Sequence, residues 1–578
     1  MSLPAAKIAD PKTTTPRPEL DEQLVRLRQN AQSWARSPIK DRIDLARQLI
    51  AGYVAVADEL VAVGCEKKGI DRNSPAAYEE WFASPVSVIR MLRQLIESLE
   101  KLDRGLSPLA ADKLSTDADG RVIAQVFPGS TFDKLLFAAY RGEVWFQKGQ
   151  TIDQVLAKMG EHYKTPVESR VGRICLILGA GNVASIPPLD FMTKLFNEGT
   201  VCILKMNPVN AHVGPLVERG FAAAIEKGLL AVVYGGGDVG GYLTHHKEVD
   251  EIHITGSDKT HDFLVWGADP AEQKERKAKK DPKLGKAITS ELGNISPVII
   301  VPGPYTAEEF EYQGKTISTA VTNNASFNCN AAKLLVQSAG WEGRDKFNAA
   351  VKSALSISPV RRAYYPGAED RWNQLVKSHA KVEKIGTAGP GELSWAMISD
   401  LNSEDANEQC YSMEPWCGVL SETSLAETDP VKFLDQAVKF VNDKVWGTLA
   451  ATIIIHPTTL KQPGVEAAFK RALADLRYGA IGVNCWPAMC YALGQTPWGA
   501  HPSSSLEDIQ SGLGWVHNTY LLGGVEKAIV FGDLTSSPKP VWFSDNKTGH
   551  LLGKRMVAFE ADPSWLKLPG ILVNALKG

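Results

Sequence analysis

Residues 173–207 read RICLILGAGNVASIPPLDFMTKLFNEGTVCILKMN, and this stretch decides the fold class. An apolar run ends in glycines, a helical segment begins near two prolines and ends at Gly199, and a second apolar run follows. Continuous apolar strands joined by a helix of this length predict a βαβ unit in a parallel sheet. Because such sheets bind ligands beyond the carboxyl ends of their strands, we expect functional residues there.

The same alternation continues along the chain. Helical and strand patterns follow in turn to EIHITG at 251–256, and a second apolar block begins at ITSELGNISPVIIVPG, 288–303. Further strands are expected in WGTLAATIIIHP at 446–457 and AIGVNCW at 480–486. Residues 20–103 repeat apolar side chains at spacings of three and four, which predicts helices. The fold class is therefore α/β, with two parallel-sheet units.

Composition limits the possible partners. The 578 residues are 44% apolar and 22% charged, with a net charge of −3 and a pI near 6.4, which indicates neither a nucleic-acid nor a membrane partner. No apolar run reaches the length of a spanning helix, and the start reads as a polar arm, so we expect a cytoplasmic protein. The eight cysteines are scattered, which argues against a disulfide framework. Cys485 and Cys490 lack further metal ligands beside them, so no metal site is predicted.

Two motifs are open to a plain structural interpretation. The charged run at 269–286 is predicted to be a solvated surface insertion, although its lysines could also approach an anionic ligand. GGGDVGG at 235–241 matches GxGxxG, but no acidic residue ends the next strand, so a tight turn is the simpler reading. Gly256 and Ser257 are the better phosphate candidates, because they end a strand and open a helix whose N–H groups are free.

Cys329 lies among small and amide residues in NNASFNCNAA, 323–332. An isolated cysteine is usually a buried, inert thiol. However, AVVYGGGDVGGYLTHHKEVDEIHITGS, ITSELGNISPVIIV, NNASFNCNAA and EPWCGV resemble, in that order, segments of the aldehyde dehydrogenase superfamily. The stretches VNCW, TPWGAHPSSS and SGLG are similar to its C-terminal signature, and the resemblance covers about residues 35–530.

The resemblance implies an NAD(P)-dependent oxidation of an aldehyde to a carboxylic acid through a cysteine thiohemiacetal and thioester. Cys329 would be the nucleophile, and Glu291, 38 residues earlier, the general base that activates water. Attack requires a thiolate, so we expect a local field that lowers the thiol pKa. Small neighbours would leave room for a substrate, and Glu291 would need a pKa near neutrality.

The same resemblance assigns cofactor contacts for NAD or NADP. Lys205 would bind the adenosine ribose, Gly256 and Ser257 the pyrophosphate, and Glu414 the nicotinamide ribose, with Trp416 where the family usually has Phe. Pro208 stands where NAD-preferring members often have a glutamate, so NADP is also possible.

The oxyanion donor is ambiguous. Asn182 is the natural amide, but counting back from Lys194 points to Ser185; we prefer Asn182, because its N–H₂ is a fixed donor. GNVASIPPLDF also resembles the fatty acyl-CoA reductases, so a CoA-dependent acylating enzyme using the same thiol is an alternative. A catalytically silent relative that serves as a binding protein is the third possibility.

The expected organisation has three parts. Residues 1–292 would hold N-terminal helices and the dinucleotide-binding domain, with an oligomerisation segment near 145–170. Residues 293–483 would form the catalytic domain with the nucleophilic Cys, and 484–578 would return to the core and end in an oligomerisation or extension segment. By resemblance the C-terminal strand would add to a neighbour's sheet in a homodimer or homotetramer. The tail beyond residue 534 is expected to be an assembly or surface extension, with a membrane-touching helix as the alternative.

Overall fold

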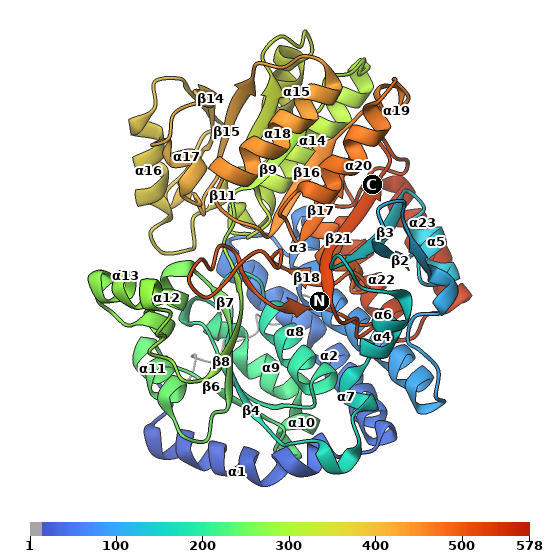
Figure 1. Cartoon of the computed structure of the whole chain (residues 1–578), viewed down its shortest axis with the longest axis vertical. Coiled ribbons are helices and arrows are strands. Elements are labelled where there is room, and N and C mark those ends of the chain that lie inside the picture. The colour runs from blue at the N-terminus through green and yellow to red at the C-terminus, as the bar shows by residue number, and fades with distance from the viewer. Residues whose placement is uncertain (1–13) are drawn as a thin grey trace.

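The computed structural model describes residues 14–578, and two sheets organise them (Figure 1). The lower sheet in that view has six strands in the order β19-β8-β7-β4-β5-β6. Its members are β4 (Ile174–Leu178), β5 (Val201–Lys205), β6 (Leu230–Val233), β7 (Glu251–Gly256), β8 (Ala287–Leu292) and β19 (Gly512–Leu513). All pair in parallel except β19, so the predicted parallel sheet is confirmed.

The βαβ unit that the sequence predicts forms as expected. β4 and β5 are almost wholly buried, because helices cover both faces of the sheet. Between them α8 (Ile186–Met192) begins with prolines in its first turn and continues as a wider helical turn to Asn197. Gly199 ends this helix with a φ of +68°, a left-handed conformation that glycine adopts at no steric cost. Lys205 is thereby fixed at the carboxyl end of β5.

The upper sheet has eleven strands in the order β1-β2-β3-β21-β17-β16-β9-β10-β15-β14-β12. Its bounds are β1 (Leu114–Thr116), β2 (Val122–Phe127), β3 (Tyr140–Phe146), β9 (Ser296–Ile300), β10 (Ala332–Ser338), β12 (Val382–Ile385), β14 (Trp395–Leu401), β15 (Val419–Leu425), β16 (Ala450–Ile454), β17 (Ala480–Val483) and β21 (Val525–Gly532). The run from β21 to β14 is parallel, and β1 to β3 and β12 extend it antiparallel. Cys329 lies just before β10.

One expectation about assembly segments needs correction. The segment near 145–170, expected to serve in oligomerisation, contains α6 (Ile152–Lys158) and α7 (Glu161–Lys164), and its role stays a prediction. The C-terminal strand β21 pairs in parallel with β17 and antiparallel with β3 of its own chain, not with a neighbour. Pairing within the chain satisfies the backbone groups on both edges of β21.

The residues beyond 534 form packed helices. α22 (Gly549–Ala561) lies against α2 (Ile39–Lys68), α3 (Tyr78–Trp81) and α4 (Ser87–Asp103), and α23 (Leu568–Lys577) packs on α22. Gly549 and Gly553 allow this close approach, because a Cβ on either would lie within 3 Å of the Tyr78 or Trp81 side chain. The fully buried carboxylate of Glu560 pairs with Arg90 at 2.8 Å and Arg93 at 2.7 Å. Much of this segment is therefore core rather than a surface extension.

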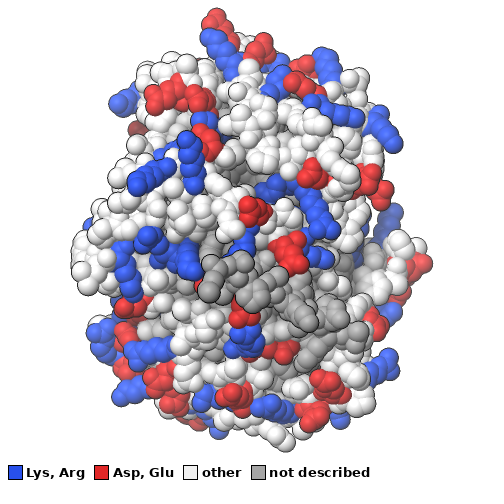
Figure 2. Space-filling model, turned by 180° about the vertical axis from the view of Figure 1, so that it is seen from behind, with Lys and Arg blue, Asp and Glu red and all other residues white. Residues whose placement is uncertain are grey.

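The helix within the charged run at 269–286 lies on the surface, as predicted. α13 (Pro270–Lys279) has no buried residue, and its Lys277 pairs with Asp262 on α12 (Asp258–Trp266) at 2.6 Å. Figure 2 shows acidic and basic side chains interspersed over one whole face. Among the described residues, α2 alone is long and apolar enough to cross a membrane, and half of its apolar window is buried inside the protein.

Candidate active site

A cleft of about 880 Å³ lies between the carboxyl ends of the lower-sheet strands and the segments that lead into β10, β15 and β16 of the upper sheet. Every candidate site residue from the sequence lines it except Ser185. These are Asn182, Lys205, Gly256, Ser257, Glu291, Cys329, Glu414 and Trp416. Residues more than 230 positions apart in the chain thus meet in one cavity, although their individual roles stay predictions.

Glu291 and Cys329 lie together on the cleft wall. Glu291 is the last residue but one of β8 and is only 3% exposed, and burial raises its carboxyl pKa to about 7. Burial and the facing carboxylate also raise the pKa of the Cys329 thiol well above its usual range. The expectation of a lowered thiol pKa is therefore wrong in this state. The arrangement allows Glu291 to accept the thiol proton when the sulfur attacks.

The loop before Cys329 has an unusual backbone. Asn324, Ala325 and Ser326 have φ values of +53°, +53° and +71°, a left-handed turn that costs each non-glycine residue about 1–2 kcal/mol. Asn324 offsets this cost by donating its amide to the Asn182 and Phe327 carbonyls, at 3.0 and 3.1 Å. Lys333 Nζ donates to the Ser326 carbonyl at 3.1 Å. The amide-rich sequence around Cys329 thus holds a strained turn that presents the thiol to the cleft.

Asn182 and Ser185 differ in their access to the thiol. Asn182 lines the cleft with Cys329, and its amide donates one N–H to the Phe327 carbonyl at 2.8 Å, which fixes the side chain and leaves a second N–H. Ser185 is fully buried and its Oγ bonds to the Tyr491 hydroxyl at 2.8 Å. The geometry therefore favours Asn182 as the oxyanion donor.

The far end of the cleft presents backbone donors to an anion. Ser257 caps α12 by accepting from the Thr260 N–H at 3.2 Å, and Gly256 precedes it at the end of β7. A helix N-terminus attracts phosphate groups through its free N–H groups and its dipole. Lys205 lies beside this end of the cleft, where burial lowers its pKa.

The GGGDVGG stretch contributes more than a turn, which the sequence interpretation missed. Gly236, Gly237, Gly240 and Gly241 line the cleft at the start of α11 (Gly237–His245). No atom lies within 4 Å of where a Cβ on Gly237 or Gly241 would be. This bare surface leaves room for a flat or extended group against the helix backbone. The glycine-rich run itself was the available signal.

Glu414 and Trp416 close the opposite wall. Glu414 accepts a hydrogen bond from the Asn294 N–H at 3.1 Å, and burial raises its carboxyl pKa. Arg371 donates to the carbonyls of Pro415 at 3.0 Å and Trp416 at 3.3 Å, so it holds this segment in place. A carboxylate on this wall can bind sugar hydroxyls, and the bare helix ends opposite can bind a pyrophosphate. These features fit a dinucleotide.

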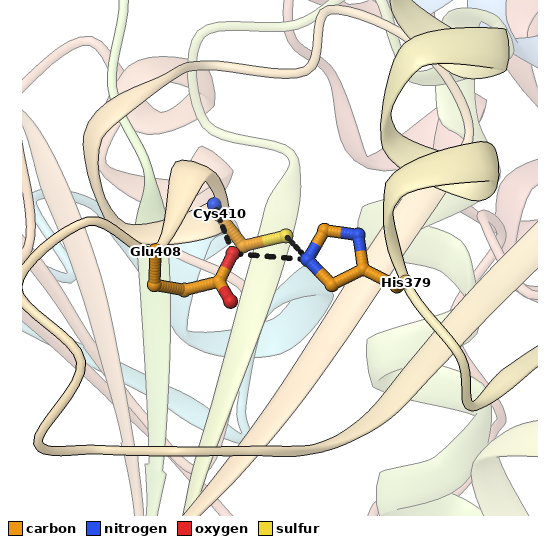
Figure 3. Close-up of side chains that lie close together, drawn as sticks. All are labelled: His379, Glu408 and Cys410. Carbon is orange, nitrogen blue, oxygen red and sulfur yellow. Dashed lines mark hydrogen bonds and ion pairs between the residues drawn. The ribbon is translucent and has the colours of Figure 1, made fainter.

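Three further polar side chains meet just outside the cleft (Figure 3). His379, after α16 (Ala368–Ser378), places Nε2 3.1 Å from Glu408 Oε1 and 3.9 Å from the Sγ of Cys410 in α17 (Gln409–Ser412). His379 Nδ1 lies 2.7 Å from the Leu375 carbonyl, so Nδ1 carries a proton and donates it there. The trio ties α16 to the segment that leads into Glu414.

Comparisons with known proteins find similarity to one family of enzymes. Residues 184–389 match the aldehyde dehydrogenase family. Betaine aldehyde dehydrogenase from chloroplasts of Amaranthus hypochondriacus is 22% identical over 348 residues, which cover 58% of this chain and 59% of that protein. The chain spans about half the length of the curated relatives it matches, with 59% and 47% for the first two.

Solved structures show the fold. An indole-3-acetaldehyde dehydrogenase complexed with NAD⁺ superposes with a TM-score of 0.58 and 16% identity, covering 89% of each chain. An NADP-dependent glyceraldehyde-3-phosphate dehydrogenase from Bacillus halodurans, complexed with NADP, gives 0.58 and 15%, covering 89% of this chain and 92% of that one. The predicted fold with two parallel-sheet units is thereby confirmed.

Proposed function

Because the chain belongs to the aldehyde dehydrogenase superfamily, we propose that it oxidises an aldehyde to a carboxylic acid with NAD or NADP as the acceptor. The observation that carries this proposal is that Cys329 and Glu291 meet on the wall of one cleft, with the pKa of Glu291 raised to about 7. A carboxyl with that pKa can take up and release protons near neutral pH.

The proposed sequence begins at the thiol. Cys329 Sγ bonds to the aldehyde carbon while its proton passes to Glu291, and the Asn182 amide donates to the oxygen that becomes negative. A bound nicotinamide would accept the hydride that leaves this carbon. Cys329 then holds the acyl group as a thioester. Glu291 first loses its proton to solvent and then takes a proton from a water molecule, whose oxygen attacks the thioester carbon. The acid departs and the thiol is restored.

The cleft residues would divide the cofactor between them. The α12 N-terminus with Gly256 and Ser257 would hold the pyrophosphate, Lys205 the adenosine ribose, and Glu414 the nicotinamide ribose beside Trp416. Asn207 lines the cleft after Lys205, and Pro208 begins the next helical turn, so this loop carries no carboxylate to repel a 2′-phosphate. Both NAD and NADP are therefore included in the proposal.

The test is oxidation of a panel of aldehydes by purified protein, with NAD and NADP separately, with and without CoA. Acid formed without CoA supports the proposal. Absolute CoA dependence would favour the acylating alternative, and no turnover under any condition would favour a silent binding protein. Cys329→Ser is expected to abolish turnover, whereas Cys202→Ser, a buried thiol in β5, provides the control.

We also propose that the enzyme is cytoplasmic. All eight cysteines lie in the described residues and none forms a disulfide, which is typical of a reducing compartment. We further propose, from the family resemblance alone, that the protein forms a homo-oligomer.

A further inference from the structure

A second cavity of about 160 Å³, called the inner cavity, also reaches Cys329 and is mostly lined by residues that do not line the dinucleotide cleft. Asn182, Ile186 and Cys329 line both spaces. A carbonyl group beside the thiol would therefore have its reactive carbon at the junction and the rest of its molecule in the inner cavity. The wall of that cavity is largely apolar, and its aromatic members are Tyr78, Phe82, Phe137, Trp486, Tyr491 and Trp542.

The charged groups in this wall are all partnered. Lys68 pairs with Glu80 at 2.7 Å, and Glu79 pairs with Arg361 at 2.9 Å. Arg90 lies 2.8 Å from Glu560. A charged substrate would compete with these buried pairs, and breaking one leaves an uncompensated buried charge, which is strongly unfavourable. The inner cavity therefore suits a neutral group.

The C-terminal extension supplies one side of the cavity. Val541, Trp542, Met556 and Glu560 all line it, and all lie beyond residue 534. The Trp542 segment is fixed, because its carbonyl accepts from the Tyr78 hydroxyl at 3.1 Å and from Thr319 Oγ1 at 3.2 Å. Glu560 anchors α22 through its ion pairs with Arg90 and Arg93.

We infer that the inner cavity binds the apolar tail of a neutral aldehyde, about the size of a benzene ring, and that Trp542 and Met556 of the C-terminal extension limit its length. This inference rests on the proposed function and adds the substrate class to it. The size follows from the volume, since an apolar cavity of about 150 Å³ is known to hold benzene. The substrate is expected to be neutral because every charged side chain in the cavity wall already has an ion-pair partner. The inference separates this chain from the betaine aldehyde dehydrogenases it matches, because betaine aldehyde carries a permanent positive charge.

The first experiment measures kcat/KM for propanal, hexanal, benzaldehyde, decanal and betaine aldehyde. The native enzyme is expected to prefer hexanal or benzaldehyde over decanal and over betaine aldehyde, each by about tenfold or more. Trp542→Ala is expected to raise kcat/KM for decanal about tenfold and to leave propanal within threefold. A gain of activity cannot come from misfolding. Met556→Ala, expected to act in the same direction, provides a second variant.

Trp565→Ala is the matched control. Trp565 belongs to the same extension, is 62% exposed and packs against Phe132, but does not line the cavity. Its chain-length profile should equal that of the native enzyme. A profile unchanged in both Trp542→Ala and Met556→Ala, or a preference for betaine aldehyde, would overturn the inference.

The second experiment separates this inference from the proposed function, because it needs no turnover. Cys329→Ser protein is titrated with benzyl alcohol, a neutral ring, and with choline, a quaternary ammonium cation, and the melting temperature is followed. Benzyl alcohol is expected to raise it and choline is not. If no aldehyde is oxidised but benzyl alcohol still stabilises the protein and Trp542→Ala weakens this effect, the proposed function fails and the apolar site stands. If choline raises the melting temperature and benzyl alcohol does not, the inference of a site for a neutral apolar group is overturned.

Discussion

Glu291 is buried and Cys329 is partly buried, and neither group ionises easily, since reduced contact with water raises the pKa of both. With the Glu291 pKa at about 7, the carboxylate that accepts protons becomes the main form only above that pH. We therefore expect kcat/KM to rise with pH through about 7 to a plateau. Glu291→Gln should remove this rise, slow a burst of at most one equivalent of reduced cofactor and stop the reaction after it, because neither the thiol nor the attacking water then has a base to take its proton. Rapid-mixing absorbance measures that burst; multiple turnovers at the native rate would contradict the assigned role.

The same residue also predicts a change in stability. A carboxyl whose pKa is higher in the folded than in the unfolded state stabilises the fold fully below the unfolded pKa of 4.5, and this contribution is lost as pH rises through about 7. Glu291→Gln mimics the protonated form. It should therefore be more stable than the native protein at pH 8, by up to about 3 kcal/mol, and nearly equal at pH 4.5. Chemical unfolding at the two pH values measures the difference. If the native protein and Glu291→Gln are equally stable at pH 8, ionisation of the Glu291 carboxyl does not destabilise the fold.

Asn182 and Ser185 give a third prediction at this scale. Removing one oxyanion donor typically costs about 10²–10³ in kcat. We expect that loss for Asn182→Ala, because Asn182 lines the cleft together with Cys329, and less than tenfold for Ser185→Ala, whose hydroxyl is hydrogen-bonded to Tyr491. Steady-state kinetics on one substrate decides, with melting temperatures to exclude unfolding. A larger loss for Ser185 would reverse the assignment.

Among the elements, α16 and α17 fix the position of the Glu414 segment, and His379 joins them through Glu408. Without this contact the cofactor wall should loosen, so His379→Ala is expected to raise KM for the dinucleotide several-fold with little change in kcat. His456→Ala is the control, because His456 faces Glu309 at 3.4 Å in a comparable pair and does not line the cleft. Repeating the assay after chelator treatment shows whether a metal takes part in the contact. If KM is unchanged, the contact between His379, Glu408 and Cys410 serves only local packing.

How far the sequence predicts the fold also differs between elements. β4, α8 and β5 follow from apolar runs, prolines and Gly199, since these signals are local. Which sheet β21 joins is not local, because the strand can pair with either chain through the same backbone groups. The candidate site was found because the family motifs keep their order. The left-handed turn at 324–326 and the inner cavity were not, since both depend on contacts between distant segments.

For the whole molecule, the important feature is that β21 is paired on both sides with strands of its own chain. Copies of the protein therefore do not need to exchange this strand to complete the upper sheet, and we predict that one copy is active by itself. We expect the specific activity per chain to stay constant on dilution from micromolar to nanomolar, even where light scattering shows oligomers of the 62.8 kDa chain dissociating. Activity that falls in step with dissociation would mean that strand exchange between copies completes the site.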